Sequence, residues 1–211
     1  MGRMPTHVNK RGYVSPARQA RADATRARIL DAAATLFLQN GYARTSTAAI
    51  GRAAGVSEAS VFAAWRTKGE LLVAVAADRV GRHPDFPLRE DPGWRQPTGG
   101  AGTDGAIARF ARVARRAHER SWQLLAIVGS AARDDPAVAA AYDDAAQRRH
   151  ADCAWFVKEV IGLRGAKAAR AADAVWALTA VENYRRLVID RGWSARAYER
   201  WLTGLLTGQL T

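Results

Sequence analysis

The chain of 211 residues contains a single cysteine, Cys153. One thiol cannot close an internal disulfide, and it cannot build the cysteine cage of a structural zinc site. The sequence also lacks an apolar run near the roughly 18 residues that a membrane span needs, and its N-terminus lacks the apolar segment of a secretory signal. These absences predict a cytoplasmic protein with no membrane partner, no resident metal and no cofactor.

Acidic residues are scarce, because 20 Asp and Glu face 32 Lys and Arg and leave a net charge of +12. Residues 1–28 hold seven basic side chains against one acid, Asp23, and so carry half of that net charge. Pro5, Gly12 and Pro16 lie here without an apolar period, which predicts a flexible basic arm over residues 1–22. Such an arm suits an anionic polymer, DNA first, although a solvated tail without a partner has the same composition.

Runs of β-branched residues are also missing, whereas Ala and Arg, both good helix formers, are abundant. We therefore expect an all-α fold without strands or internal repeats. Ile29, Leu30, Ala33, Leu36 and Phe37 would share one face of a first helix that begins near Thr25 and ends at Gly41. Further helices are expected at 47–54, after Ser57, after the Thr67–Glu70 capping box, and at 105–119, 121–133, 136–161, 167–190 and 195–210.

Four prolines and five glycines break the helical pattern over residues 84–105, which predicts a loop or linker. The expected organisation is a basic arm (1–22), a first helical domain (23–70) and a second, larger helical domain (71–211). The long helix before the linker would belong partly to both domains.

Residues 47–65 have the spacing of a helix-turn-helix: a positioning helix, a tight turn through Gly55, and a second helix capped by Ser57 that would project outward. Thr25–Val75, with "TSTAAIGRAAGVSEASVFAAWRTKGELLVAV" at its centre, resembles the DNA-binding domain of the tetracycline-repressor (TetR) family. The matching marks are Gly41-Tyr42, Thr45-Ser46, Ile50, Ala53-Ala54-Gly55-Val56-Ser57, Phe62, Trp65, Lys68 and Glu70-Leu71. A moderate second resemblance covers the last two helices.

The resemblance implies a dimeric regulator, most often a repressor, that binds a palindromic double-stranded DNA operator and is released by a small-molecule effector. It assigns DNA binding to residues 23–70 and effector binding and dimerisation to residues 71–211, and it also implies specific DNA contacts. Phosphates would be bound by Thr45, Ser46 and Thr47 at a helix N-terminus, where simple capping is the alternative, and by Arg44 and Lys68. The major groove would be met by Ser57, Glu58, Ala59, Ser60 and Ala63, and Arg18 and Arg21 could reach a minor groove.

The second helix departs from the family pattern. Phe62 stands where a tyrosine commonly supplies a phosphate-binding hydroxyl, and Glu58–Ala64 contains no Arg, Lys, Asn or Gln for bidentate base readout. Serine hydroxyls, methyl contacts and Glu58 remain for base contacts, and an ion pair with Arg52 is the equal alternative for Glu58. Phosphate contacts and the arm should therefore carry an unusual share of the affinity.

Two sets of residues are expected in the C-terminal half. A dimer interface is predicted from the apolar sides of the last two helices, with the chain's own core as the alternative: Leu178, Val181, Tyr198, Trp201, Leu202, Leu205 and Leu206. The resemblance implies a pocket for a flat, largely apolar effector among residues that otherwise form plain core: Phe110, His118, Trp122, Tyr142, Trp155, Phe156 and Trp176. Glu182 and Asn183 would supply its polar contacts, or lie at the interface or in solvent.

Enzyme motifs are weak. Gly100–Gly105 matches G-x-G-x-x-G, but no apolar strand precedes it. His150 and Cys153 lie one helical turn apart, and two ligands do not close a metal site. The chain is therefore not expected to be an enzyme. The rival hypothesis is an architectural, weakly selective DNA-binding protein without an effector, which the large aromatic C-terminal half argues against.

Overall fold

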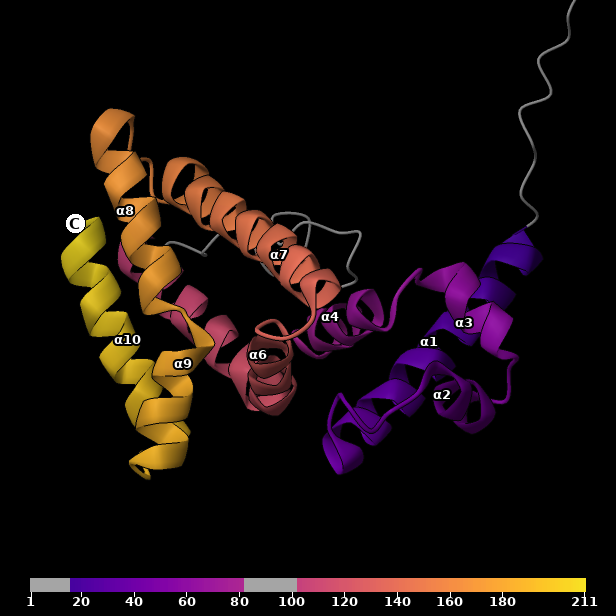
Figure 1. The fold of residues 1–211 in the computed structure, drawn as a ribbon. Helices are drawn as coiled ribbons and strands as arrows, with labels where there is room; N and C mark the ends of the chain where they lie inside the picture. The colour runs from indigo at the N-terminus through magenta and orange to yellow at the C-terminus, as the bar shows by residue number, and fades with distance from the viewer. Residues whose placement is uncertain (1–15, 82–101) are drawn as a thin grey trace, which may run out of the picture.

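The computed structural model describes residues 16–81 and 102–211, and all regular structure within these ranges is helical (Figure 1). The N-terminal helices are α1 (Pro16–Asn40), α2 (Thr47–Ala54), α3 (Glu58–Ala64) and α4 (Lys68–Arg79). The C-terminal helices are α6 (Gly102–Ala131), α7 (Pro136–Trp155), α8 (Gly165–Leu178), α9 (Val181–Tyr184) and α10 (Ala195–Leu210), with π-helical turns η2 (Phe156–Val160) and η3 (Arg185–Asp190). The all-α prediction is confirmed.

Helix α1 begins nine residues earlier than its apolar period indicates. Pro16 occupies its first position, where the missing N–H of proline costs nothing, and the following residues are mostly Ala and Arg. Residues 16–22 of the predicted arm are therefore helical. Residues 1–15 of the arm and residues 84–101 of the predicted linker lie outside the described residues.

Helix α6 is continuous where the sequence predicts two helices that meet near Arg120. Ser121 does not cap a new helix, because its hydroxyl donates a 2.7 Å hydrogen bond back to the carbonyl of Ala117 in the same helix. The opposite error occurs at 167–190, where α8 ends at Leu178. There Asn183 Nδ2 donates to the carbonyls of Ala177 and Leu178, and these bonds satisfy helix-end acceptors.

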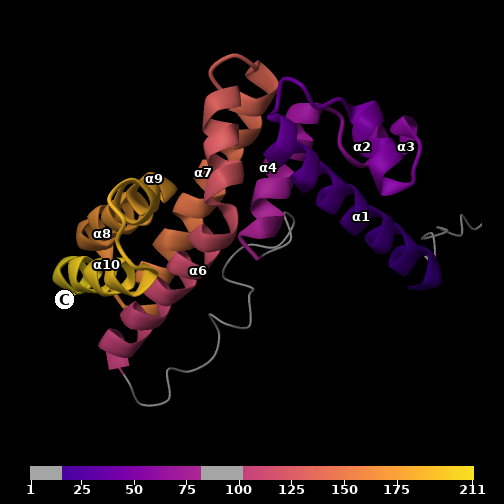
Figure 2. The same ribbon diagram turned by 90° about the horizontal axis from the view of Figure 1, so that it is seen from below.

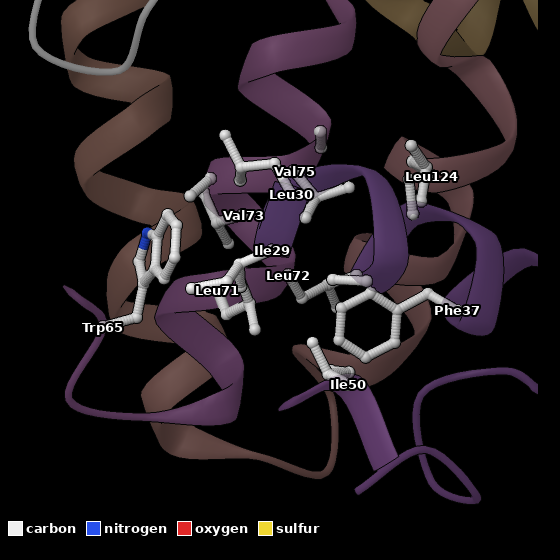
Figure 3. Packing of buried hydrophobic residues seen from close by; sticks show 14 of the residues in the cluster. Ile29, Leu30, Phe37, Ile50, Trp65, Leu71, Leu72, Val73, Val75 and Leu124 are labelled. Atoms are coloured by element: carbon white, nitrogen blue, oxygen red, sulfur yellow. The ribbon is translucent and has the colours of Figure 1, made fainter. Parts of the chain in front are cut away.

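A first hydrophobic core joins the helix-turn-helix to the rest of the molecule. Figure 3 shows Ile29 and Phe37 of α1, Ile50 of α2 and Leu71 of α4 converging with Leu124 of α6. The sequence pattern after Ser57 predicts that Val61, Phe62 and Trp65 all point into the core. Val61 and Trp65 are buried as expected, but Phe62 is 45% exposed, so the prediction is wrong for Phe62. The core continues past residue 70 through α4 into α6 and the start of α7.

A second core fills the space between α6, α7, α8 and α10 (Figure 2). Ile107 and Phe110 of α6 pack there with Phe156, Val175 of α8 and Leu202 of α10. Because α6 and α7 each contribute to both cores, these two helices keep the two halves in continuous contact. No helix of the described residues is long and apolar enough to cross a membrane.

Candidate nucleic-acid interface

The turn between α2 and α3 is tight and held by backbone hydrogen bonds. Gly55 adopts a left-handed conformation with φ 67°, which only glycine adopts without strain. The N–H of Val56 donates 2.9 Å to the carbonyl of Gly51. A Cβ atom on Gly51 would meet Val56 O at 3.1 Å and Glu58 N at 3.3 Å. The second helix can therefore start immediately after the first, with Ser57 as its N-cap.

Helix α3 presents the predicted groove-reading residues on one accessible face. Ser57, Glu58, Ala59 and Ala63 are exposed, and Ser60 is half-buried. Exposed Phe62 lies among them and supplies a large apolar contact surface. This face combines short hydroxyls, methyl groups, one ring and one carboxylate, and its reading of DNA bases stays a prediction.

The polar groups of that face are ordered by bonds within the helix-turn-helix. Thr47 donates a 2.5 Å hydrogen bond to Glu58 Oε1, so the carboxylate is held at the start of α2 and Arg52 is not its observed partner. The hydroxyls of Ser57 and Ser60 lie 2.8 Å apart. Pre-ordered side chains lose less conformational entropy when they meet a partner.

Thr45 is a correction to the predicted phosphate contacts. Its side chain is 2% exposed, and its hydroxyl donates to the carbonyls of Gly41 and Leu36 at 2.8 and 3.2 Å. Thr45 therefore fixes the α1–α2 connection from inside. Ser46 caps α2 by accepting from Ala49 N, and Arg44 is exposed beside it, so these two remain accessible at the helix N-terminus.

Arg18 and Arg21 lie on the first turns of α1 and are exposed, rather than on an extended arm. A helical position fixes their direction, so any DNA contact they make depends on where α1 points. Further along α1, the guanidinium of Arg26 stacks on the ring of Trp65 at 4.5 Å. Asp31 pairs with Arg79 of α4 at 2.7 Å. Both contacts brace α1 against the rest of the domain.

Lys68 lies in a joint between the DNA-binding domain and the C-terminal half. Its Nζ donates 3.0 Å to the carbonyl of Tyr42 and stands 4.1 Å from the centre of the Tyr42 ring. The Tyr42 hydroxyl in turn donates 2.6 Å to Asp135 Oδ2, and Asp135 is the N-cap of α7. We call Tyr42, Lys68 and Asp135 the joint triad. Sequence reasoning missed Asp135, whose capping position before Pro136 was its only signal.

Electrostatics and close packing hold the joint together. The hydrogen bond from Tyr42 lowers the pKa of the Asp135 carboxyl, with help from the N–H groups of Ala137 and Val138 and from nearby Lys68. Burial and the same carboxylate raise the pKa of Tyr42. Beside this triad, a Cβ on Gly69 would lie 2.9 Å from Val138 N, so α4 and α7 meet almost backbone to backbone. Because there is no free space between them, a displacement of α7 would also displace the start of α4.

Several residues predicted for the effector pocket are instead plain core or structural caps. Phe110 and Phe156 are buried and stack with ring centres 4.3 Å apart. Glu182 is exposed, which matches the solvent alternative, and Asn183 caps α8. Tyr142 packs on the first core.

The remaining polar aromatics leave buried atoms without a partner. Among the described residues, His118 Nδ1, Trp176 Nε1 and the Tyr198 hydroxyl are buried and form no hydrogen bond. Burial, with a contribution from nearby Arg149, lowers the pKa of His118 to about 4, so its imidazole is neutral at pH 7. Tyr184 links His118 and Tyr198, with ring centres 5.6 and 5.1 Å away. Trp122, Trp155 and Trp176 are partly buried at the edge of the same core.

The predicted dimer interface requires a second correction. Tyr198, Leu202 and Leu206 are fully buried within their own chain, because they form the face of α10 that packs on α6 and α8. Leu205 is 38% exposed and Trp201 is partly exposed, as are Leu178 and Val181. Sequence reasoning missed Trp193, which is 37% exposed and lies 6.3 Å from Trp201 between ring centres.

Residues 29–75 match the sequence model of the family described as "Bacterial regulatory proteins, tetR family". No curated protein sequence matches the chain. Among solved structures, Salmonella enterica GusR covers 94% of this chain and 99% of its own with a TM-score of 0.65 and 21% identity. NalD, the secondary repressor of the MexAB-OprM efflux pump in Pseudomonas aeruginosa, covers 90% and 98% with a TM-score of 0.61 and 21% identity.

A third similar structure is a transcriptional regulator of Saccharomonospora viridis in complex with choline. It covers 88% of this chain and 96% of its own, with a TM-score of 0.61 and 20% identity. The helix-turn-helix, its exposed second helix and the helical C-terminal half define a DNA-binding regulator. Its N-terminal domain belongs to the TetR family of bacterial regulatory proteins, and the whole chain has the fold of solved regulators of that family.

Proposed function

We propose that this protein is a dimeric transcriptional repressor that binds a palindromic operator and releases it when its C-terminal half binds a small ligand. The joint triad is the observation that carries the proposal. A 2.6 Å hydrogen bond ties Tyr42, which precedes the helix-turn-helix, to Asp135, the N-cap of α7 in the effector half. Such a contact couples the position of the DNA-binding domain to that of α7 in the effector half.

In the DNA-bound state, α3 enters the major groove and the N-terminus of α2 faces a phosphate. The free N–H groups and macrodipole of α2 favour an anion there, and exposed Arg44 adds a full charge. Arg18 and Arg21 extend the basic surface along α1. Because α3 carries no bidentate base-reading side chain, these phosphate contacts supply most of the affinity, and two copies of α3 supply the selectivity.

The effector occupies the second core near His118, Tyr198 and Trp176. Buried polar atoms without a partner are uncommon, and a ligand carrying one or two hydrogen-bonding groups on an apolar body would satisfy them. The neutral imidazole of His118 both donates and accepts, so it suits an uncharged polar group. One similar regulator was solved with choline, which supports a small-molecule role for this half without identifying the ligand here.

Release of the operator would follow from the packing contacts that connect the second core to the first. Ligand entry beside His118 and Trp122 moves α6, whose far end, with Leu124 and Val128, lies in the first core. That shift reaches α4 through packing, and it reaches Tyr42 and Lys68 of the DNA-binding domain through α7 and the joint triad. The ligand then favours a state in which the two copies of α3 no longer match the spacing of the operator half-sites.

The test is selection of bound sequences from a random pool of double-stranded DNA at near-physiological salt. We expect a palindrome whose half-sites lie about 34–36 Å apart or a multiple of that distance. An Ala63→Glu variant places a carboxylate on the exposed face of α3 and should recover nothing. The matched Ala140→Glu variant, on an exposed position of α7, should recover the same palindrome. Recovery of no motif, or only an A·T-rich bias, would favour an architectural DNA-binding protein instead.

A further inference from the structure

An arginine-rich cleft lies between α6 and α10, far from the DNA-binding helices. It has a volume of about 360 Å³ and is lined by Arg112, Arg115, Arg116, Arg196, Glu199 and Arg200. We propose that this cleft binds a phosphorylated small molecule, with pyrophosphate as the simplest member of the class. The proposal does not rest on the effector site or on repression.

Two short rows of side chains build the cleft. Arg112, Arg115 and Arg116 recur at i, i+3 and i+4 and so share a face of α6. Arg196 and Arg200 recur at i and i+4 on α10 and face them. The apolar sides of the same two helices pack in the second core, so the separation of the rows is fixed by the fold.

Glu199 organises the cleft without neutralising it. Its carboxylate accepts a 2.6 Å hydrogen bond from Arg115 and lies 3.6 Å from Arg112. Arg115 is held from the other side by Glu119, at 2.5 Å, and its side chain is only 14% exposed. One guanidinium is thereby fixed as the floor of the cleft by two carboxylates.

The other arginines leave a surplus of positive charge. Within the described ranges, Arg116, Arg196 and Arg200 form no ion pair with a carboxylate, and Arg196 and Arg200 are exposed. Like charges crowded on two facing helices repel each other, so the bare cleft is electrostatically unfavourable. A bound polyanion removes this repulsion.

Guanidinium groups select the chemistry of the ligand. Their planar pairs of N–H donors match two oxygens of a phosphate, and several separate guanidiniums suit adjacent phosphates better than a single carboxylate. A volume of 360 Å³ is at the small end of ligand sites, which fits a diphosphate or a phosphorylated metabolite. DNA is a poor occupant, because α10 and α3 lie at opposite ends of the molecule (Figures 1 and 2).

The experiment is isothermal titration of the full chain with inorganic pyrophosphate, at constant near-physiological ionic strength. We expect saturable binding at one site per chain. The double variant Arg116→Ala/Arg200→Ala should weaken it at least tenfold, since charge-assisted hydrogen bonds are lost. The matched variant Arg133→Ala/Arg148→Ala removes the same charge from exposed positions outside the cleft, and should change affinity less than twofold.

Three results would overturn the proposal. Equal weakening by both double variants would show a diffuse effect of net charge, and non-saturable heat would show that no site exists. Binding of random double-stranded DNA supplies the third readout, because both double variants should bind it equally. A selective loss of DNA binding in Arg116→Ala/Arg200→Ala would make the cleft a second DNA surface.

Discussion

Tyr42 shows how one side chain serves both halves of the molecule. Its ring packs beside Phe37 and under the Lys68 ammonium, while its hydroxyl reaches Asp135. The same carboxylate accepts N–H bonds from Ala137 and Val138, so the first turn of α7 is ordered by a residue that also holds the DNA-binding domain. In the sequence, Tyr42 stands out only as a residue that matches the TetR family pattern. Its role in the joint is not predictable, because its partner Asp135 lies 93 residues away.

Tyr42→Phe should destabilise the protein by about 1–2 kcal/mol, since a part-buried hydrogen bond to a carboxylate is lost while the ring remains. Chemical denaturation measures the change. Tyr142→Phe is the control, because the Tyr142 hydroxyl donates no hydrogen bond in the described part of the chain, and we expect less than about 0.5 kcal/mol there. Equal effects of the two substitutions would mean that the Tyr42–Asp135 bond adds nothing to stability.

His118 predicts a pH dependence of stability. Burial lowers its pKa to about 4 in the folded state, below the ordinary value near 6.5, so between these values only the unfolded chain binds the proton. Above pH 6.5 His118 is neutral in both states and does not reduce the free energy of unfolding. As the pH falls from 6.5 towards 4, that free energy decreases by up to about 1.4 kcal/mol per pH unit. Denaturant titrations from pH 7 to pH 4 measure it.

His118→Gln should flatten this slope, whatever its effect on stability at pH 7. His150→Gln is the matched control, because His150 is far more accessible and pairs with Asp173 at 2.7 Å. If His118→Gln leaves the slope of the native protein unchanged, the imidazole is not held neutral by the fold.

At the scale of the element, the helix-turn-helix depends on glycine where two backbones approach. Gly51→Ala places a methyl group 3.1 Å from Val56 O and 3.3 Å from Glu58 N, and both atoms belong to the turn that positions α3. We expect a loss of about 1–3 kcal/mol from this overpacking, with DNA binding weakened further because α3 is displaced. Thermal unfolding and a DNA-binding titration measure the two effects.

Gly129→Ala is the matched substitution, because Gly129 lies inside α6 with nothing within 4 Å of the added atom. Alanine is the better helix former by about 0.8–1 kcal/mol, so this variant should be as stable as the native chain or more stable. A Gly51→Ala protein that gains stability in the same way would show that the turn has room to spare.

The helices whose ends are marked by caps and glycine were predictable from sequence. Ser46, Gly55, Ser57 and Thr67 each act as the sequence indicates, because a cap is a local interaction between neighbours in the chain. The early start of α1 was not predictable, since Ala and Arg carry no apolar period. The apolar period also predicts the apolar stripe of α10 correctly. The period alone does not distinguish a face that packs in the chain's own core from a face that packs on a partner subunit.

At the scale of the whole molecule, the packing of α10 limits which of its apolar residues the proposed dimer would use. Tyr198, Leu202 and Leu206 face inward, which leaves Trp201 and Leu205, with Trp193 against Trp201, as the accessible apolar side. This apolar side and the arginine-rich cleft occupy different faces of α10. A dimer built on the first leaves the second open to solvent.

Leu205→Glu should convert the dimer to a monomer, because it puts an unpaired carboxylate at the centre of the apolar side, where removal from water is costly. Analytical ultracentrifugation measures the change, and we expect dimer affinity to fall at least a hundredfold. Thr207→Glu adds the same charge two residues further along α10, on another side of the helix, and should leave the dimer intact. Both variants should keep native helix content, because residue 205 is not part of the second core.

Separated monomers make half as many phosphate contacts, so the dependence of DNA affinity on salt should fall to about half its slope. A Leu205→Glu protein that stays dimeric would place the interface elsewhere, with Leu178 and Val181 the next residues to substitute.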